Sequence, residues 1–140
     1  MPRIYRSMLP DGPFPQVGRS GKTLGVRIDG GSIDIAIDEV GNVAPGDGGG
    51  MSVAPGWRDL PPHLIPRRLR HLCGKAQGNN KLQCWRFGDG PFRNEDLTSE
   101  LCLDVDSATH GTVQPRYEMT LETFEIAIAA TRSQWTVDEA

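Results

Sequence analysis

The sequence predicts an α+β fold made of short strands and one C-terminal helix. Several short segments alternate apolar and polar side chains, which is typical of strands with one buried face. Only residues 121–134 repeat apolar side chains at helical spacing. The 17 glycines and 11 prolines make up one residue in five, so irregular connections must occupy much of the chain. A length of 140 residues favours a single domain, 1–140, with one core.

The expected strands are spread along the chain and are short, mixed or antiparallel. Residues 3–9 form the first, before a proline-rich loop over 11–25 that is a candidate lid or clamp. Residues 32–38 give the clearest alternation, which places Ile33 and Ile37 on one face with Ile35 between them. The remaining strands are expected at GMSVAP, 81–87, 100–106 and 110–118.

The helical segment carries a recognisable N-terminal signal. Thr120 is a favourable N-cap, and Phe124 and Ile128 belong to the apolar stripe that follows it. A second, shorter helix is expected over 66–73, beginning at a proline. The last five residues, 136–140, are expected to fray.

Charge and hydropathy exclude some classes of protein. The net charge of −3 and the pI near 5.6 argue against a strongly basic nucleic-acid coat or a polybasic membrane binder. A local basic cluster at 67–75, RRLRHLCGK, could contact phosphate, although a solvated helix face is the commoner outcome. No apolar run approaches ~20 residues and no secretory signal is recognisable, so we expect no membrane partner and a cytoplasmic location.

Familiar ligand motifs are incomplete. VGRSGKT ends like a phosphate-binding loop, but Gln16 occupies the position of its first glycine. Three histidines and the cysteines Cys73, Cys84 and Cys102 fit no common zinc spacing, so no metal is expected and the thiols are predicted to be buried in a reducing compartment. GDGGG lacks dinucleotide spacing, yet its glycines would let a ligand or another backbone approach closely just before Ser52.

Three ordered segments resemble a known family. They are Ile4-Tyr5-Arg6, the stretch from LGVR at 24–27 to GNVAPGDGGGMSV at 41–53, and ATHGTVQPRYEM at 108–119 before the last helix. In this order they resemble bacterial toxins with an ADP-ribosyltransferase-like fold, a family that includes a type VI secretion effector of Pseudomonas. The resemblance leaves 10–24 and 58–100 uncovered.

The resemblance implies a site for NAD as substrate. Arg6 and Tyr5 correspond to the first strand, where an arginine binds phosphate or ribose. Arg27 matches a functional arginine, and Ser52 matches a ribose-binding serine that Gly49 and Gly50 precede. Met51 replaces the family's threonine beside that serine. From the residues alone, Arg6 could instead be a surface cation, and Arg27 could pair with Asp29 or Asp34. Ser52 could satisfy a turn, and His110 could be a loop histidine with a local hydrogen bond.

The third catalytic position departs from the usual pattern. Transferases of this fold generally place a glutamate there, whereas this chain offers His110 and Gln114, with Glu118 further along. Two hypotheses therefore stand. The first is a small cytoplasm-acting toxin that transfers ADP-ribose from NAD to an unknown macromolecule and is neutralised by an immunity or antitoxin protein. The second is a non-catalytic module of the same fold that binds a protein, a nucleotide or RNA, with nucleic acid not the favoured partner.

Overall fold

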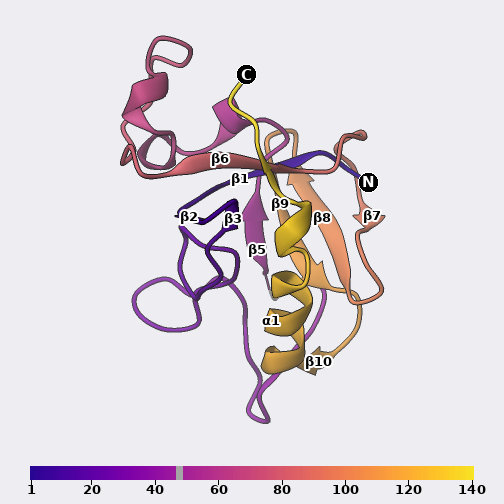
Figure 1. Ribbon diagram of the computed structural model, residues 1–140. Coiled ribbons are helices and arrows are strands. Elements are labelled where there is room, and N and C mark those ends of the chain that lie inside the picture. The colour runs from indigo at the N-terminus through magenta and orange to yellow at the C-terminus, as the bar shows by residue number, and fades with distance from the viewer. Residues whose placement is uncertain (47–48) are drawn as a thin grey trace.

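The computed structural model describes residues 1–46 and 49–140, and two antiparallel sheets dominate it (Figure 1). The smaller sheet has the strand order β1–β6–β11, with β1 at Ile4–Met8, β6 at Gln83–Phe87 and β11 at Thr136–Val137. The larger has the order β5–β9–β8–β7, with β5 at Met51–Val53, β9 at His110–Pro115, β8 at Leu101–Ser107 and β7 at Glu95–Asp96. The mixed α+β class is thus confirmed.

The two sheets join where β1 meets the end of β5. Tyr5 and Ala54 exchange two backbone hydrogen bonds, of 2.7 and 3.0 Å. The smaller pairings lie outside these sheets: β2 (Pro10–Asp11) with β3 (Phe14–Pro15), and β4 (Asn42–Val43) with β10 (Met119–Thr120). Helix α1 (Leu121–Ala129) follows β10 directly. Four 3₁₀ turns complete the fold: η1 (Trp57–Asp59), η2 (Pro62–Leu64), η3 (Arg67–Leu69) and η4 (Arg132–Gln134).

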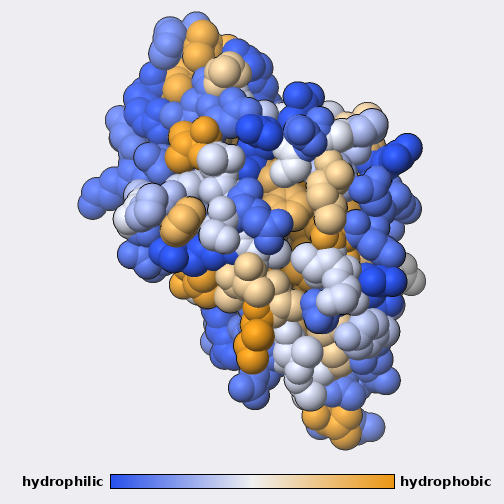
Figure 2. Space-filling model, turned by 45° about the vertical axis from the view of Figure 1, so that its right-hand side comes forward, coloured by the Kyte–Doolittle hydropathy of each residue, from blue (hydrophilic) through white to orange (hydrophobic). Residues whose placement is uncertain are grey.

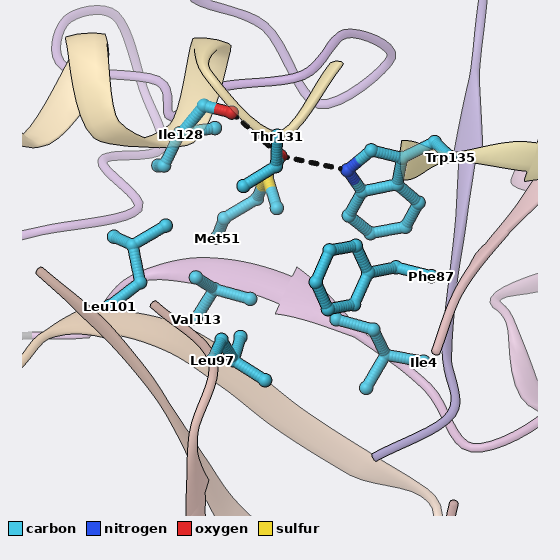
Figure 3. Close-up of a pocket in the computed structure, with 9 residues that line it drawn as sticks. All are labelled: Ile4, Met51, Phe87, Leu97, Leu101, Val113, Ile128, Thr131 and Trp135. Carbon is cyan, nitrogen blue, oxygen red and sulfur yellow. Dashed lines mark hydrogen bonds between the residues drawn. The ribbon is translucent and has the colours of Figure 1, made fainter. Parts of the chain in front are cut away.

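The main core fills the space between the sheets and helix α1. Figure 3 shows part of it, where Phe87 and Trp135 pack with ring centroids 5.4 Å apart. Thr131 satisfies the indole of Trp135 by accepting its N–H at 2.9 Å. The cavity left among these side chains measures about 10 Å³, which is too small for a ligand. This interior therefore serves packing alone.

The predicted C-terminal helix is confirmed but shorter than expected. The Thr120 hydroxyl accepts a hydrogen bond from the Thr123 N–H at 3.1 Å, as the capping pattern predicts. Helix α1 ends at Ala129, and the chain continues as the separate turn η4. At 66–73 the structure contains only the 3₁₀ turn η3, which starts after Pro66.

The strand expected at 32–38 does not form. Ile35 is 1% exposed, but Ile33 and Ile37 are 60% and 37% exposed, so the three isoleucines do not share a buried face. The segment makes only one isolated bridge, from Ile35 to Gly49. An alternating pattern forms a strand only where a neighbouring strand supplies its hydrogen bonds, and here no continuous partner lies alongside among the described residues.

The expected fraying of 136–140 is also wrong. Strand β11 pairs with β6, and the Tyr5 hydroxyl donates to Asp138 at 2.7 Å. Arg86 contacts the same carboxylate at 2.9 Å, and Arg68 binds Glu139 through two 2.7 Å hydrogen bonds. These partners are distant in sequence, so no local pattern could reveal them.

Across the described residues, no helix has the length and apolar character needed to cross a membrane.

Candidate functional site

A cleft of about 610 Å³ lies beside β5. Its walls are the loop 20–27, strand β5 with the residues after it, the segment 59–64, and the turn 109–110. A volume of this order suits a nucleotide-sized ligand. The cleft gathers Arg6, Arg27, Ser52 and His110, four of the residues that the resemblance singled out.

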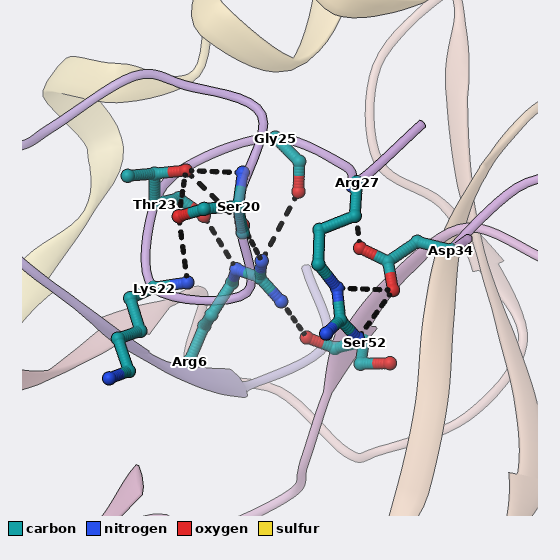
Figure 4. A network of polar contacts seen from close by, with 8 residues as sticks. All are labelled: Arg6, Ser20, Lys22, Thr23, Gly25, Arg27, Asp34 and Ser52. Atoms are coloured by element: carbon teal, nitrogen blue, oxygen red, sulfur yellow. Dashed lines mark hydrogen bonds and ion pairs between the residues drawn. The ribbon is translucent and has the colours of Figure 1, made fainter. Parts of the chain in front are cut away.

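Arg6 lies at the base of this cleft and is 5% exposed, so it is not a surface cation. Its guanidinium donates to four carbonyl oxygens: Ser52 at 2.7 Å, Thr23 at 2.9 Å, and Ser20 and Gly25 at 3.2 Å (Figure 4). Burial lowers the pKa of Arg6 to about 10, which still leaves it charged at neutral pH. Because all four acceptors are neutral, the cleft has a buried positive charge without a carboxylate in hydrogen-bond contact.

The loop that Arg6 holds forms a fixed wall of the cleft. Within it, the Ser20 N–H donates to the Thr23 hydroxyl at 3.1 Å, and the Lys22 N–H donates to the Ser20 hydroxyl at 3.2 Å. No helix follows this turn, so the segment differs from a phosphate-binding loop, as its sequence indicates. The sequence analysis missed Ser20 as a member of the site. Its proximity depends on the Arg6 contact across the loop, for which the sequence contains no local signal.

Arg27 pairs with Asp34 at the rim of the cleft, which is one of the alternatives the sequence left open. The Asp34 carboxylate accepts from the Arg27 backbone N–H at 2.7 Å and from its guanidinium at 3.1 and 3.3 Å. The Arg27 side chain is 44% exposed. The guanidinium therefore has a fixed position while one side of it remains open to a ligand.

Ser52 presents its side chain to the cleft from the middle of β5, between the buried Met51 and Val53. Gly49 and Gly50, which precede it, allow neighbouring backbone segments to approach closely. A Cβ on Gly49 would collide with the Asp34 carbonyl, and one on Gly50 would collide with the Val113 carbonyl. Gly49 also has a φ of +83°, which side-chain-bearing residues rarely adopt. Gly48, the first of the predicted run, lies outside the described residues.

His110 lines the cleft from the first position of β9, directly after the turn that joins β8 to β9. Its Nδ1 lies 2.8 and 3.0 Å from the two carboxylate oxygens of Asp106. If Nδ1 carries the proton and donates it to Asp106, Nε2 becomes the proton-accepting nitrogen of the ring. A histidine oriented in this way is suited to general-base chemistry.

Besides Gly49 and Gly50, two of the predicted site residues do not line the cleft. Gln114 is 3% exposed and ties the backbone of Gly46 by accepting its N–H at 2.8 Å and donating to its carbonyl at 3.1 Å. It lines a different hollow, beside Asp104. Tyr5 packs in a second apolar cluster, and its hydroxyl is bonded to Asp138. The structure thus places both residues in supporting contacts.

Conversely, the cleft includes side chains that the sequence analysis did not select. Asp59 and His63 line the wall formed by 59–64, and Lys22 lines the opposite loop.

Within the ranges 1–46 and 49–140, no group of three or more His, Cys, Asp or Glu side chains could hold a metal ion. Comparisons with protein-family models, curated proteins and solved structures found no match for this chain.

The three cysteines are free thiols, but only Cys84 is buried, so the predicted burial of Cys73 and Cys102 is wrong. We therefore expect the three thiols to differ in reactivity. Burial raises the pKa of Cys84 from 9.0 to about 12, so its reactive thiolate is scarce at pH 8. A thiol-specific reagent should modify Cys73 and Cys102, which are partly exposed, well before Cys84. A Cys84→Ala variant should lack the slowly reacting thiol, which identifies that thiol as Cys84.

Between pH 9 and 12 the Cys84 thiol ionises in the unfolded chain but stays protonated in the folded protein. The free energy of unfolding should therefore fall as the pH rises through this range.

Rapid reaction of all three thiols in the folded protein would contradict the burial of Cys84. The same reagent in denaturant provides the control, because all three cysteines should then react at similar rates.

Proposed function

We propose that the chain binds NAD in this cleft and transfers its ADP-ribose to a macromolecular acceptor, acting as a bacterial toxin. The observation that carries the proposal is the buried charge of Arg6 beneath a nucleotide-sized cleft, with no carboxylate in hydrogen-bond contact. A diphosphate is the kind of group that such a charge attracts. The resemblance of the Arg6, Arg27 and Ser52 segments to ADP-ribosyltransferase-like toxins supports the same ligand.

Each residue then has a role in the transfer. Arg6 and Arg27 attract the diphosphate, and the Ser52 hydroxyl binds the ribose next to nicotinamide. The glycosidic bond breaks with its electron pair leaving on nicotinamide, and positive charge develops on the ribose. The acceptor's nucleophile attacks that carbon and loses its proton to Nε2 of His110, which Asp106 orients. Placement and electrostatics supply most of the catalysis.

The prediction is loss of toxicity at the cleft. Controlled expression of the wild type in bacterial cytoplasm should arrest growth, and Arg27→Ala or Ser52→Ala should restore it at equal levels of folded protein. Removing one charged or hydroxyl contact should lower nicotinamide release from NAD by the purified protein at least tenfold. Arg19→Ala and Ser133→Ala are the matched controls, because neither residue lines the cleft. Unchanged toxicity in both cleft variants would exclude this site.

The second candidate is a binding module without turnover. It is favoured because no glutamate is among the described lining residues. The cleft's carboxylates are those of Asp34, which is already bonded to Arg27, and Asp59. Calorimetric binding of NAD without nicotinamide release would support this alternative. Growth arrest together with nicotinamide release would exclude it.

A further inference from the structure

Residues 57–82, here called the basic lobe, have a charge opposite to the rest of the chain. The lobe contains six Lys or Arg residues and one acidic residue, a net charge of +5. The other residues contain nine Lys or Arg and 17 Asp or Glu, a net charge of −8, which accounts for the total of −3. The acidic pI of the whole chain therefore conceals a strongly basic region.

The cations of the basic lobe also lack carboxylate partners. In the described residues outside the lobe, six of the nine Lys and Arg side chains form ion pairs with Asp or Glu. In the lobe only Arg68 does so, with Glu139. Among the described residues, Arg67, Lys75 and Lys81 have neither an ion pair nor a side-chain hydrogen bond, and all three are exposed. Such unneutralised charges create a positive surface potential.

The lobe displays these charges on a fixed scaffold. Trp57, Ile65 and Leu69 are buried in its own apolar cluster, which packs against Tyr5 and Cys84. Its backbone is closed by hydrogen bonds such as Gly78 N–H to Ile65 carbonyl at 2.7 Å and Arg67 N–H to Gly78 carbonyl at 3.1 Å. Because the backbone that carries the cations is fixed, only their side chains lose conformational entropy when a polyanion binds.

The lobe also adjoins the cleft, since residues 59–64 form one of its walls. In Figure 1 the lobe lies above strand β6, at the upper left of the molecule. Figure 2 shows that the upper part of the molecule is mostly hydrophilic, with a few apolar residues. A polyanion on the lobe would lie beside the mouth of the cleft, and the acidic remainder of the protein would repel it elsewhere.

We propose that the basic lobe binds the phosphodiester backbone of a single-stranded nucleic acid. Leu72 is its only large apolar residue with an exposed side chain among those described, so the lobe lacks the apolar centre of a protein interface. The lobe is built from 3₁₀ turns and offers no long helix or β-ribbon for a duplex groove. Backbone contacts by Arg and Lys on an irregular surface suit a flexible single strand. This binding goes beyond the proposed transferase activity and does not depend on it.

The test is fluorescence anisotropy of the full chain with labelled 20-nucleotide single-stranded RNA and DNA of mixed sequence. We expect binding to both, which weakens about 20-fold between 50 and 200 mM salt if three phosphates are neutralised. The double variant Arg67→Glu/Lys75→Glu should bind at least tenfold more weakly than the wild type. Arg3→Glu/Arg93→Glu makes the same change of charge outside the lobe and should retain at least a third of the wild-type affinity.

Each other outcome decides against the proposal. Equal losses in the two double variants would show that net charge alone governs binding. Polyglutamate of matched charge that binds as tightly as RNA would point to an acidic protein partner instead. No binding to either oligonucleotide at 50 mM salt would also overturn it. Circular dichroism and urea unfolding of each variant separate lost binding from lost folding, and Arg67→Gln/Lys75→Gln provides a milder replacement that should weaken binding in the same direction.

Discussion

An Arg6→Met variant is expected to lose about 3–5 kcal/mol of unfolding free energy and the integrity of the cleft. The side chain is 5% exposed and donates to four carbonyl oxygens, three of them in the loop 20–25. Methionine matches the apolar stem but has no donor, so these buried acceptors would lose their partners. Leaving buried polar groups unsatisfied costs far more than losing an exposed contact.

Urea unfolding followed by tryptophan fluorescence measures this change. Arg19→Met is the matched control, because the Arg19 side chain is 55% exposed and its pairing with Glu125 lies at the surface. We expect that control to unfold at nearly the same urea concentration as the wild type, because solvent screens an exposed ion pair. Equal stability of Arg6→Met and the wild type would show that the four carbonyls do not depend on Arg6.

Arg6 lines the cleft and also holds the loop 20–25 by hydrogen bonds. The sequence indicates only the first of these roles. A resemblance in the first strand indicates an arginine that serves a ligand, and the structure does place Arg6 at the cleft. Its contacts with Thr23 and Gly25 are to backbone carbonyls, which every residue possesses and which no motif marks. A sequence reveals the donor at such a site but not its acceptors.

The same limit separates the correct predictions from the wrong ones. Strands β1, β6 and β8 form where the sequence predicts them because each finds a long neighbouring strand. The cap at Thr120 was predictable because its partner is three residues away. The segment 32–38 had an equally good pattern but found no continuous partner, whereas the C-terminal tail had a poor pattern and found Tyr5 and Arg86. A local pattern therefore predicts a strand correctly only where the fold also supplies a partner strand.

Some of the predicted site residues line the cleft, whereas Gln114 does not. Arg27, Ser52 and His110 share one cleft although they are far apart in the chain. Gln114 is on the same strand as His110, four residues further along, but it lies beside Asp104 and the Gly46 backbone. Its amide is well suited to binding a ribose, yet residue type does not determine which hollow a side chain enters. Only the register of β8 and β9 determines that.

A Gly50→Ala substitution is expected to cost about 2–3 kcal/mol and to displace Ser52. The added Cβ would overlap the Val113 carbonyl, which lies in the strand paired with β5. On the other side, the Gly50 N–H donates to the Asp34 carbonyl at 2.9 Å, so the backbone has little room to retreat. Overpacking between backbone segments forces strands apart, and this separation reduces stability.

Gly31→Ala is the control for this prediction. Its Cβ would meet nothing within 4 Å, and its φ is not in the positive range, so stability should stay constant or rise slightly. Urea unfolding compares the two variants, and nicotinamide release or NAD binding reports on the position of Ser52. A Gly50→Ala protein with wild-type stability would show that β5 and β9 can separate without cost.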